Sequence, residues 1–339
     1  MSMKKENIKA AITGGISALL VLAGGLGLEI RSELFKPIEG IAGLFRIHKD
    51  DTLRDVAFAL RQEGIIDNPI LLIWYGEITG RDRYVREGVY RIPPSLRMKQ
   101  LLELFEKGSN VRFKVVLLEG LTLKQSVKKM REAGLEVDEE FFFHPPSKFT
   151  DQYGFLEYLP QGQSLEGFLF PDSYQFYPNE TNEGIARVLL DTFDAKFKPE
   201  WYDVLASQGR SVYETVTMAS LLEKEVPTLK EKKIVSGILW KRLALGMPLQ
   251  VDATVNYTTG KSLSAVTLED IAVDSPYNTY KNQGLPLGPI ANPGQESLEA
   301  AVLPEPSDYW FYLSRQDTGE TIFSKTFNEH RIAKARYLR

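Results

Sequence analysis

The chain has 339 residues, of which 43% are hydrophobic and 25% are charged, so it can form two globular domains with buried cores. Its formal net charge of −4 provides no general attraction to nucleic acid. The absence of cysteine excludes a disulfide framework, a thiolate nucleophile and a cysteine-ligated zinc site. The 3 histidines lack the spacing of metal ligands, and we expect neither a metal nor a cofactor.

The N-terminal region contains a long uncharged segment. Residues 10–28 read AAITGGISALLVLAGGLGL and follow a short tail with three lysines. A membrane-spanning helix needs about 20 apolar residues, whereas the apolar part of a signal peptide has about 7 to 15 and precedes a small-residue cleavage site, which is not evident here. We therefore predict that residues 1–9 form a cytoplasmic tail and that residues 10–30 form a helix that crosses the cytoplasmic membrane. The rest of the chain would lie on the periplasmic or extracytoplasmic side. A cleaved signal peptide or a buried core helix are the alternatives.

Three segments between residues 44 and 135 share one pattern, in which an extended apolar stretch leads through a polar turn into a helix. They read LFRIHKDDTLRDVAFALRQEGII, GVYRIPPSLRMKQLLELFEKG and FKVVLLEGLTLKQSVKKMREAGL. We expect Thr52, Ser95 and Thr122 to cap the three helices, and the third helix to end at Gly134. The apolar stretch NPILLIWYGEITG predicts another helix between the first two segments.

The first of these segments, continued to about residue 92, resembles a LysM module, which is built from similar strands and capped helices. LysM modules bind glycans that contain N-acetylglucosamine. The resemblance implies a wall-binding module, which we place over residues 31–115. The alternative is a scaffold that only positions the rest of the chain.

The second half of the chain predicts a mixed α+β domain over residues 116–339. An irregular region rich in aromatic residues and proline begins near residue 140, where the rings either fill a core or stack on sugars. Helices are expected in NEGIARVLLDTFDAKF, in YETVTMASLLEKEV, which Pro227 would close, and in KEKKIVSGILWKRLALG. The segment MPLQVDATVNYTTGKSLS reads as strand or loop, and SPYNTYKNQGLPLGPIANPGQES reads as loop. A β-hairpin in DYWFYLSRQDTGETIFSKTF precedes a last helix.

Polar residues in these segments form the candidate site. The sequence has no nucleophilic serine elbow and no glycine-rich phosphate loop, so carboxylate chemistry among hydroxyl and amide groups remains, which suits glycosidic bond cleavage. Glu223 and Glu225 are two residues apart in a predicted helix and point about 200° apart, so they cannot form a facing pair. The candidates are Glu166, Glu223, Glu225, Gln250, Asp252, Tyr257, Tyr277, Asn278 and Thr279.

Four segments resemble, in order, the hallmark segments of the YceG-like family, and the resemblance covers nearly the whole chain. They are LEGFLFPDSYQF, MASLLEKE, KRLALGMPLQVDATVNY and SPYNTYKNQGLPLGPIANPG. The chain departs from the family where Val251-Asp252-Ala253-Thr254 replaces Thr-Asp-Pro-Thr and where Gly-Leu-Pro-Leu-Gly replaces Gly-Leu-Pro-Pro-Gly. Val226 also stands where many relatives carry a hydroxyl residue.

The resemblance implies an endolytic lytic transglycosylase of peptidoglycan. Such an enzyme cleaves the β-1,4 bond between N-acetylmuramic acid and N-acetylglucosamine in nascent glycan strands, and leaves 1,6-anhydro-N-acetylmuramic acid ends. The cleavage would terminate glycan elongation beside the cell-wall synthases, the penicillin-binding proteins. Because the sugar's own 6-hydroxyl replaces water, one carboxyl group can act first as acid and then as base. Its pKa should be raised by a poorly solvated pocket.

Glu225 is our candidate for this acid, because the catalytic glutamate of the wider lytic transglycosylase group follows an apolar run near a helix end, and ASLLEKEV aligns best on its second glutamate. Glu223 is the rival, and both glutamates could instead be structural. We expect a glycan-binding cleft in which polar side chains orient the sugar or stabilise positive charge; alternatively, these residues cap helices or form turns. They are Gln250, Asp252, Tyr257, Tyr277, Asn278 and Glu166. For Glu166 we favour a structural role.

Two other functions stay open at this point. The first is a membrane-tethered, non-catalytic scaffold that binds peptidoglycan. The second is a muramidase that uses water, in which Glu223 or Asp252 would supply the second carboxylate.

Overall fold

The computed structural model describes residues 43–157, 159–160, 162–261, 266–315 and 317–337. The predicted tail and transmembrane helix, residues 1–30, lie outside these ranges, and within them no helix is long and apolar enough to cross a membrane. The described chain divides into two compact units. The small unit contains residues up to Arg112 together with Tyr177–Asn179, and the large unit contains Phe113–Phe176 and the residues from Glu180 onward. Mixed α+β structure was predicted and is confirmed.

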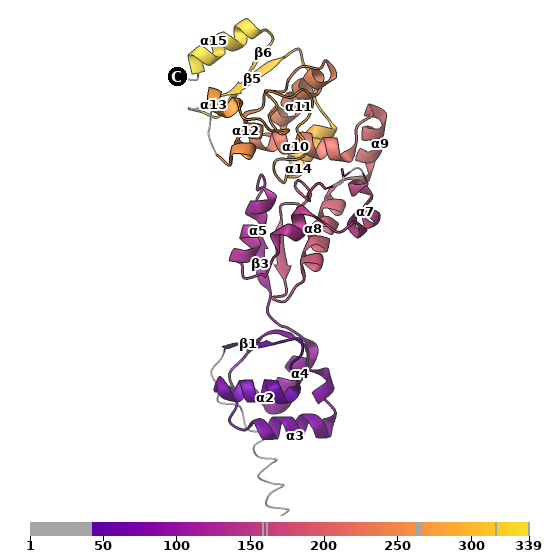
Figure 1. Ribbon diagram of the computed structural model, residues 1–339, viewed down its shortest axis with the longest axis vertical. Coiled ribbons are helices and arrows are strands. Elements are labelled where there is room, and N and C mark those ends of the chain that lie inside the picture. The colour runs from indigo at the N-terminus through magenta and orange to yellow at the C-terminus, as the bar shows by residue number, and fades with distance from the viewer. Residues whose placement is uncertain (1–42, 158, 161, 262–265, 316, 338–339) are drawn as a thin grey trace, which may run out of the picture. The chain divides into compact units, whose positions relative to one another are not determined.

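The small unit has a two-stranded antiparallel sheet, in which Phe45 pairs with Tyr90, and helices that cover it (Figure 1). Its core is separate from that of the large unit and includes Phe45, Leu60, Tyr90 and Phe105. The elements are β1 (Gly43–Ile47), α2 (Leu53–Gln62), α3 (Pro69–Thr79), the short 3-10 helix η1 (Asp82–Tyr84), β2 (Gly88–Ile92) and α4 (Met98–Lys107).

Two of the three predicted helix caps are confirmed, and one is wrong. Thr52 caps α2, and Thr122 caps the corresponding helix of the large unit; in both cases the side chain three residues later accepts the backbone N–H of the threonine in return. Ser95 is not a cap, because α4 begins at Met98 and Ser95 has a left-handed φ of 67° after two prolines. The Gln100 side chain instead accepts the backbone N–H of Arg97 at 3.0 Å.

The large unit contains four strands in two antiparallel pairs, β3 with β4 and β5 with β6, and most of the helices in the described chain. Its elements are β3 (Phe113–Val116), α5 (Leu123–Glu132), α6 (Glu139–Phe143), α7 (Lys148–Gln152), η2 (Gly154–Leu156), β4 (Ser173–Phe176), α8 (Asn182–Lys196), α9 (Pro199–Gln208), α10 (Val212–Glu225), α11 (Leu229–Ala244), α12 (Asp252–Thr259), α13 (Leu268–Ile271), α14 (Gln295–Val302), β5 (Phe311–Ser314), β6 (Thr321–Ser324) and α15 (Phe327–Tyr337).

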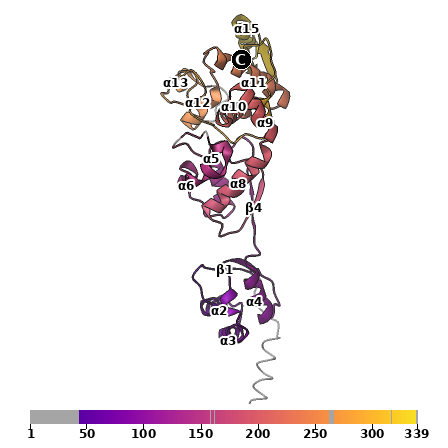
Figure 2. The ribbon, with the colours of Figure 1, turned by 90° about the vertical axis from the view of Figure 1, so that its right-hand side faces the viewer.

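Helix α10 is the central helix of the large unit. Its residues from Val212 to Leu222 are all buried except Glu214, so it is enclosed on all sides rather than amphipathic. It packs against α11, α12 and α14, and both views of the ribbon place α11 and α12 beside it (Figure 2). The helix ends at Glu225, two residues before Pro227, as the sequence predicts. Its C-terminal glutamates are therefore held by a rigid core element.

The hydroxyl-rich segment after α11 was predicted as strand or loop, and this is wrong, because residues 252–259 form α12. The hydroxyl groups of Thr258 and Thr259 bond to backbone carbonyl groups four residues earlier, at 3.0 Å in both cases. Thr254 and Val255 are buried against the core, and tertiary packing thus overrides a weak local preference for helix.

Candidate active site

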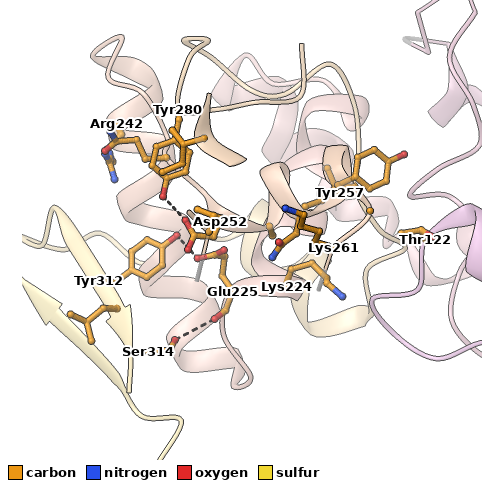
Figure 3. A pocket seen from close by; sticks show the side chains of 18 of the residues that line it. Thr122, Lys224, Glu225, Arg242, Asp252, Tyr257, Lys261, Tyr280, Tyr312 and Ser314 are labelled. Atoms are coloured by element: carbon orange, nitrogen blue, oxygen red, sulfur yellow. Dashed lines mark hydrogen bonds between the residues drawn. The ribbon is translucent and has the colours of Figure 1, made fainter. Parts of the chain in front are cut away.

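A cavity of about 1380 Å³ lies in the large unit, at the C-terminal end of α10. It is lined by residues from α5, α10, α11, α12, α15 and strand β5, which are far apart in the sequence. Figure 3 shows Glu225, Asp252, Tyr280 and Tyr312 close together on one side of this cavity. The carboxyl groups among the lining residues belong to Glu166, Glu225 and Asp252.

Glu225 is the last residue of α10, and its side chain enters the cavity (Figure 3). The hydroxyl group of Tyr312, on β5, donates a hydrogen bond of 2.9 Å to Glu225 Oε2. Burial raises the pKa of Glu225 to about 7, the nearby charge of Asp252 adds to the rise, and the bond from Tyr312 opposes it. The carboxyl group can therefore hold and release a proton near neutral pH.

Asp252 begins α12 and accepts a hydrogen bond from the hydroxyl group of Tyr280. This phenol fixes the position of the carboxylate at the cavity wall, beside Glu225 (Figure 3). The same region holds the buried guanidinium of Arg242, which donates a 3.0 Å hydrogen bond to Gln250 Oε1. One side of the cavity thus brings together three groups: the Glu225 carboxyl group with its raised pKa, the Asp252 carboxyl group, and the fixed guanidinium of Arg242.

Glu223 points away from the cavity and does not line it. Its Oε2 lies 3.4 Å from Lys232 Nζ, and the two side chains are only 9% and 4% exposed. The same oxygen accepts the hydroxyl of Ser297 at 2.6 Å and the backbone N–H of Gly294 at 3.0 Å, at the start of α14. The Glu223 side chain thus connects α10, α11 and α14. It can do so because it points about 200° away from Glu225 round the axis of α10.

Glu166 lies in a loop and is 3% exposed, with its carboxyl group at the cavity. It accepts the backbone N–H of Leu123, at the start of α5, at 2.8 Å, and the hydroxyl of Tyr257, on α12, at 3.2 Å. Burial raises the pKa of Glu166 to about 8, and these two hydrogen bonds act in the opposite direction. The side chain thus connects three segments of the cavity wall.

The remaining candidates divide between the cavity and its supporting loop. Gln250 and Tyr257 line the cavity, whereas Tyr277 and Asn278 do not. The Tyr277 ring packs on the Tyr257 ring with centroids 5.0 Å apart. The buried Asn278 amide donates to the carbonyl groups of residues 271 and 273 at 2.9 and 2.7 Å, and so holds its own loop. The hydroxyl of Thr279 receives the backbone N–H of Val251 at 3.0 Å.

Three residues of this site were not predicted from the sequence: Arg242, Tyr280 and Tyr312. Arg242 and Tyr280 belong to segments that carry the family resemblance, so their presence there was a usable signal. Tyr312 lies in a hairpin that reads as ordinary alternation, and 87 residues separate it from its partner Glu225. In the part of the chain that the structure describes, no group of three or more histidine, aspartate or glutamate side chains is placed to hold a metal ion.

Comparisons with known proteins show which family the chain belongs to. The sequence model of the YceG-like family matches residues 45–336. A relative from Bacillus subtilis strain 168, named endolytic murein transglycosylase, is 30% identical over 94% of this chain and 91% of its own length. A protein of the same name from Streptococcus pneumoniae strain D39 is 27% identical over 92% of this chain, which spans 62% of that relative.

A solved structure has a similar fold. It is a YceG-like protein from Listeria monocytogenes, with a TM-score of 0.59 and 30% sequence identity. The similarity covers 87% of this chain and 100% of the solved chain. From the family match over most of the chain and from these relatives, we conclude that the chain belongs to the YceG-like family.

Proposed function

We propose that the protein is an endolytic murein transglycosylase and that Glu225 is its single catalytic acid and base. The names of the relatives support the activity. The observation that carries the assignment of the acid is the contrast between the two glutamates of α10. Glu225 lies in the cavity with a pKa near neutrality, whereas Glu223 is held by Lys232 and by the start of α14 outside it.

The reaction needs one proton that leaves Glu225 and one that returns. The protonated carboxyl group donates its proton to the glycosidic oxygen as the bond to C1 of N-acetylmuramic acid breaks. The resulting carboxylate accepts the proton of the 6-hydroxyl group, and the oxygen of that group bonds to C1. No water is consumed, the product is a 1,6-anhydro end, and Glu225 is protonated again.

Other residues of the cavity have supporting roles in this proposal. The Asp252 carboxylate, fixed by Tyr280, is placed to stabilise positive charge that develops on the sugar ring. Gln250 and Tyr257 would orient sugar hydroxyl and acetamido groups in a glycan-binding cleft. Tyr277 and Asn278 would act indirectly, because they pack against or hold the segments that carry these side chains.

Glu166 has a structural role in the proposal. Its carboxyl group is mostly protonated at neutral pH and bonds to both α5 and α12, so it keeps the cavity wall together. The Glu166 side chain is buried within the wall, whereas Glu225 is partly exposed in the cavity.

The cellular setting extends the same proposal. The uncharged residues 10–28 would anchor the protein in the cytoplasmic membrane, with the catalytic unit on the periplasmic or extracytoplasmic side. The small unit would be a LysM-like glycan-binding module, which the order β1, α2, α3, β2 supports. Cleavage of nascent strands would end glycan elongation beside penicillin-binding proteins.

Mass spectrometry of the products tests the reaction. Purified glycan strands are incubated with the full chain, and the ends of the fragments are weighed. We expect anhydro ends, which are lighter by one water than reducing ends. Reducing ends would instead make the protein a muramidase in which Asp252 is the nearby second carboxylate. Intact strands that bind the protein without cleavage would favour a scaffold.

A further inference from the structure

Helix α3 of the small unit carries an apolar stripe that the proposed reaction does not use. Ile70, Trp74 and Ile78 are spaced four residues apart, so they lie along one side of the helix, and they are 57%, 43% and 64% exposed. Leu72 and Ile73 are buried on the other side, where α3 packs on α2. The exposed stripe is therefore additional to the residues that stabilise the fold.

The surroundings of the stripe resemble a segment at a membrane surface. Tyr84, in η1, is 63% exposed and follows the exposed Arg83, and η1 packs against α3. Glu77 is the only charged residue of α3. Isoleucine, tryptophan, tyrosine and arginine together are typical of helices that lie at the boundary between lipid headgroups and acyl chains.

The position of α3 leaves the stripe open to a partner. Figures 1 and 2 agree that α3 is the outermost layer of the small unit, on the side of α2 away from β1. A flat lipid surface can therefore contact the stripe without displacing another element of this unit.

The length of the connecting segment favours a lipid partner. The uncharged segment ends at residue 28 and β1 begins at Gly43, so residues 29–42 separate them. Even a fully extended chain of this length spans no more than about 50 Å. An anchored chain therefore keeps the small unit near the bilayer at a high effective concentration, where a modest apolar stripe suffices for contact.

We infer that the α3 stripe, formed by Ile70, Trp74 and Ile78, docks on the surface of the membrane that holds the anchor. The inference rests on the proposed membrane anchor. Docking restricts the orientation of the small unit to one in which α3 faces the lipid. Glycan and a second copy of the chain are the competing partners, and the experiment distinguishes them.

The test uses the emission of Trp74 in the full chain reconstituted into phosphatidylethanolamine and phosphatidylglycerol vesicles. Brominated acyl chains quench tryptophan that enters the boundary of the acyl region. The Trp74→Phe variant identifies the contribution of Trp74, because the difference between its emission and that of the wild type is the Trp74 signal. We expect brominated lipid to reduce this signal at least about two-fold.

Matched variants define the role of the stripe. Ile70→Asp combined with Ile78→Asp changes exposed side chains only, and we expect the quenching of Trp74 to disappear. Leu268→Asp, at a position 88% exposed in the large unit, should leave it unchanged. Circular dichroism of each variant verifies that the chain is folded.

The failures of the two proposals are distinguishable. A protein that does not float with the vesicles contradicts the anchor, and the inference with it. A protein that floats with the vesicles but has unquenched Trp74 contradicts the α3 docking alone. If added glycan strands abolish the quenching, the stripe binds glycan. If the Trp74 signal changes with the density of protein in the vesicles and not with bromine, the stripe binds a second copy of the chain. Both outcomes overturn the inference.

Discussion

The hydroxyl group of Tyr312 lowers the pKa of Glu225 against the larger effect of burial, and Tyr312→Phe removes this hydroxyl group with little change in shape. The lost bond, of 2.9 Å, stabilises the ionised carboxylate and lowers its pKa. A hydrogen bond to a charged group contributes about 1.5 to 3 kcal/mol, and one pKa unit corresponds to about 1.4 kcal/mol. Because Glu225 is partly exposed in the cavity, water replaces some of the bond, and the lower end of this range applies. We expect the pKa to rise by about 1, from about 7 to about 8.

The consequence appears in the pH dependence of kcat/KM. In the proposed mechanism bond cleavage needs protonated Glu225, so the activity of the wild type should fall as pH rises through about 7. At pH 8 about a tenth of the wild-type carboxyl groups and about half of those in the variant remain protonated. The fall in activity should therefore move upward by about one pH unit in Tyr312→Phe, even if the maximum rate is lower.

The assay is the rate of release of anhydro-ended fragments from defined glycan strands between pH 5 and 9. Tyr309→Phe is the matched control, because Tyr309 lies just before β5 but does not line the cavity. Its profile should coincide with that of the wild type. A Tyr312→Phe profile that keeps the wild-type midpoint, or moves to lower pH, would refute the assignment of Tyr312 as a hydrogen-bond donor to the working acid.

Two further predictions concern the other glutamates. Glu223→Ala leaves the buried Lys232 without its partner, so urea denaturation should show a loss of about 3 to 5 kcal/mol in the free energy of unfolding; an unchanged midpoint would contradict the structural role. The folded pKa of Glu166, about 8, is above its unfolded value of about 4.5, so its contribution to stability is complete below pH 4.5 and is lost as pH rises through 8. Between pH 5 and pH 8 the free energy of unfolding should therefore decrease less in Glu166→Gln than in the wild type, by on the order of a few kcal/mol, and the decrease in Tm should be smaller too. Equal decreases in the two proteins would contradict the assignment.

Local features of the fold could be predicted from the sequence because they depend on neighbouring residues. The hydroxyl groups of Thr52 and Thr122 cap helices by accepting backbone N–H groups three residues later, and Pro227 lies two residues after the end of α10. Ser95 failed as a cap because the two preceding prolines lead into a left-handed turn. Helix α12 was missed because its threonines favour other conformations until burial and bonds to backbone carbonyl groups stabilise the helix.

The site could be predicted only in part, because its geometry depends on contacts between distant segments. Helical periodicity was enough to separate the directions of Glu223 and Glu225. It could not show that Lys232 and Ser297 surround the first, or that Tyr312 binds the second from another element. Asn278 has the polarity of a sugar-binding residue, and only its hydrogen bonds to the carbonyl groups of residues 271 and 273 reveal that its amide is engaged within the loop.

The most direct test of the single-acid mechanism compares Glu225→Gln with Glu223→Gln. Both changes retain the shape of the side chain and remove its acid. Each full-length variant is first shown by circular dichroism to be folded, and is then incubated with glycan strands whose fragments are weighed by mass spectrometry. Anhydro ends from the wild type and Glu223→Gln, and none from Glu225→Gln, are the predicted result. Anhydro ends from Glu225→Gln at the wild-type rate would contradict it.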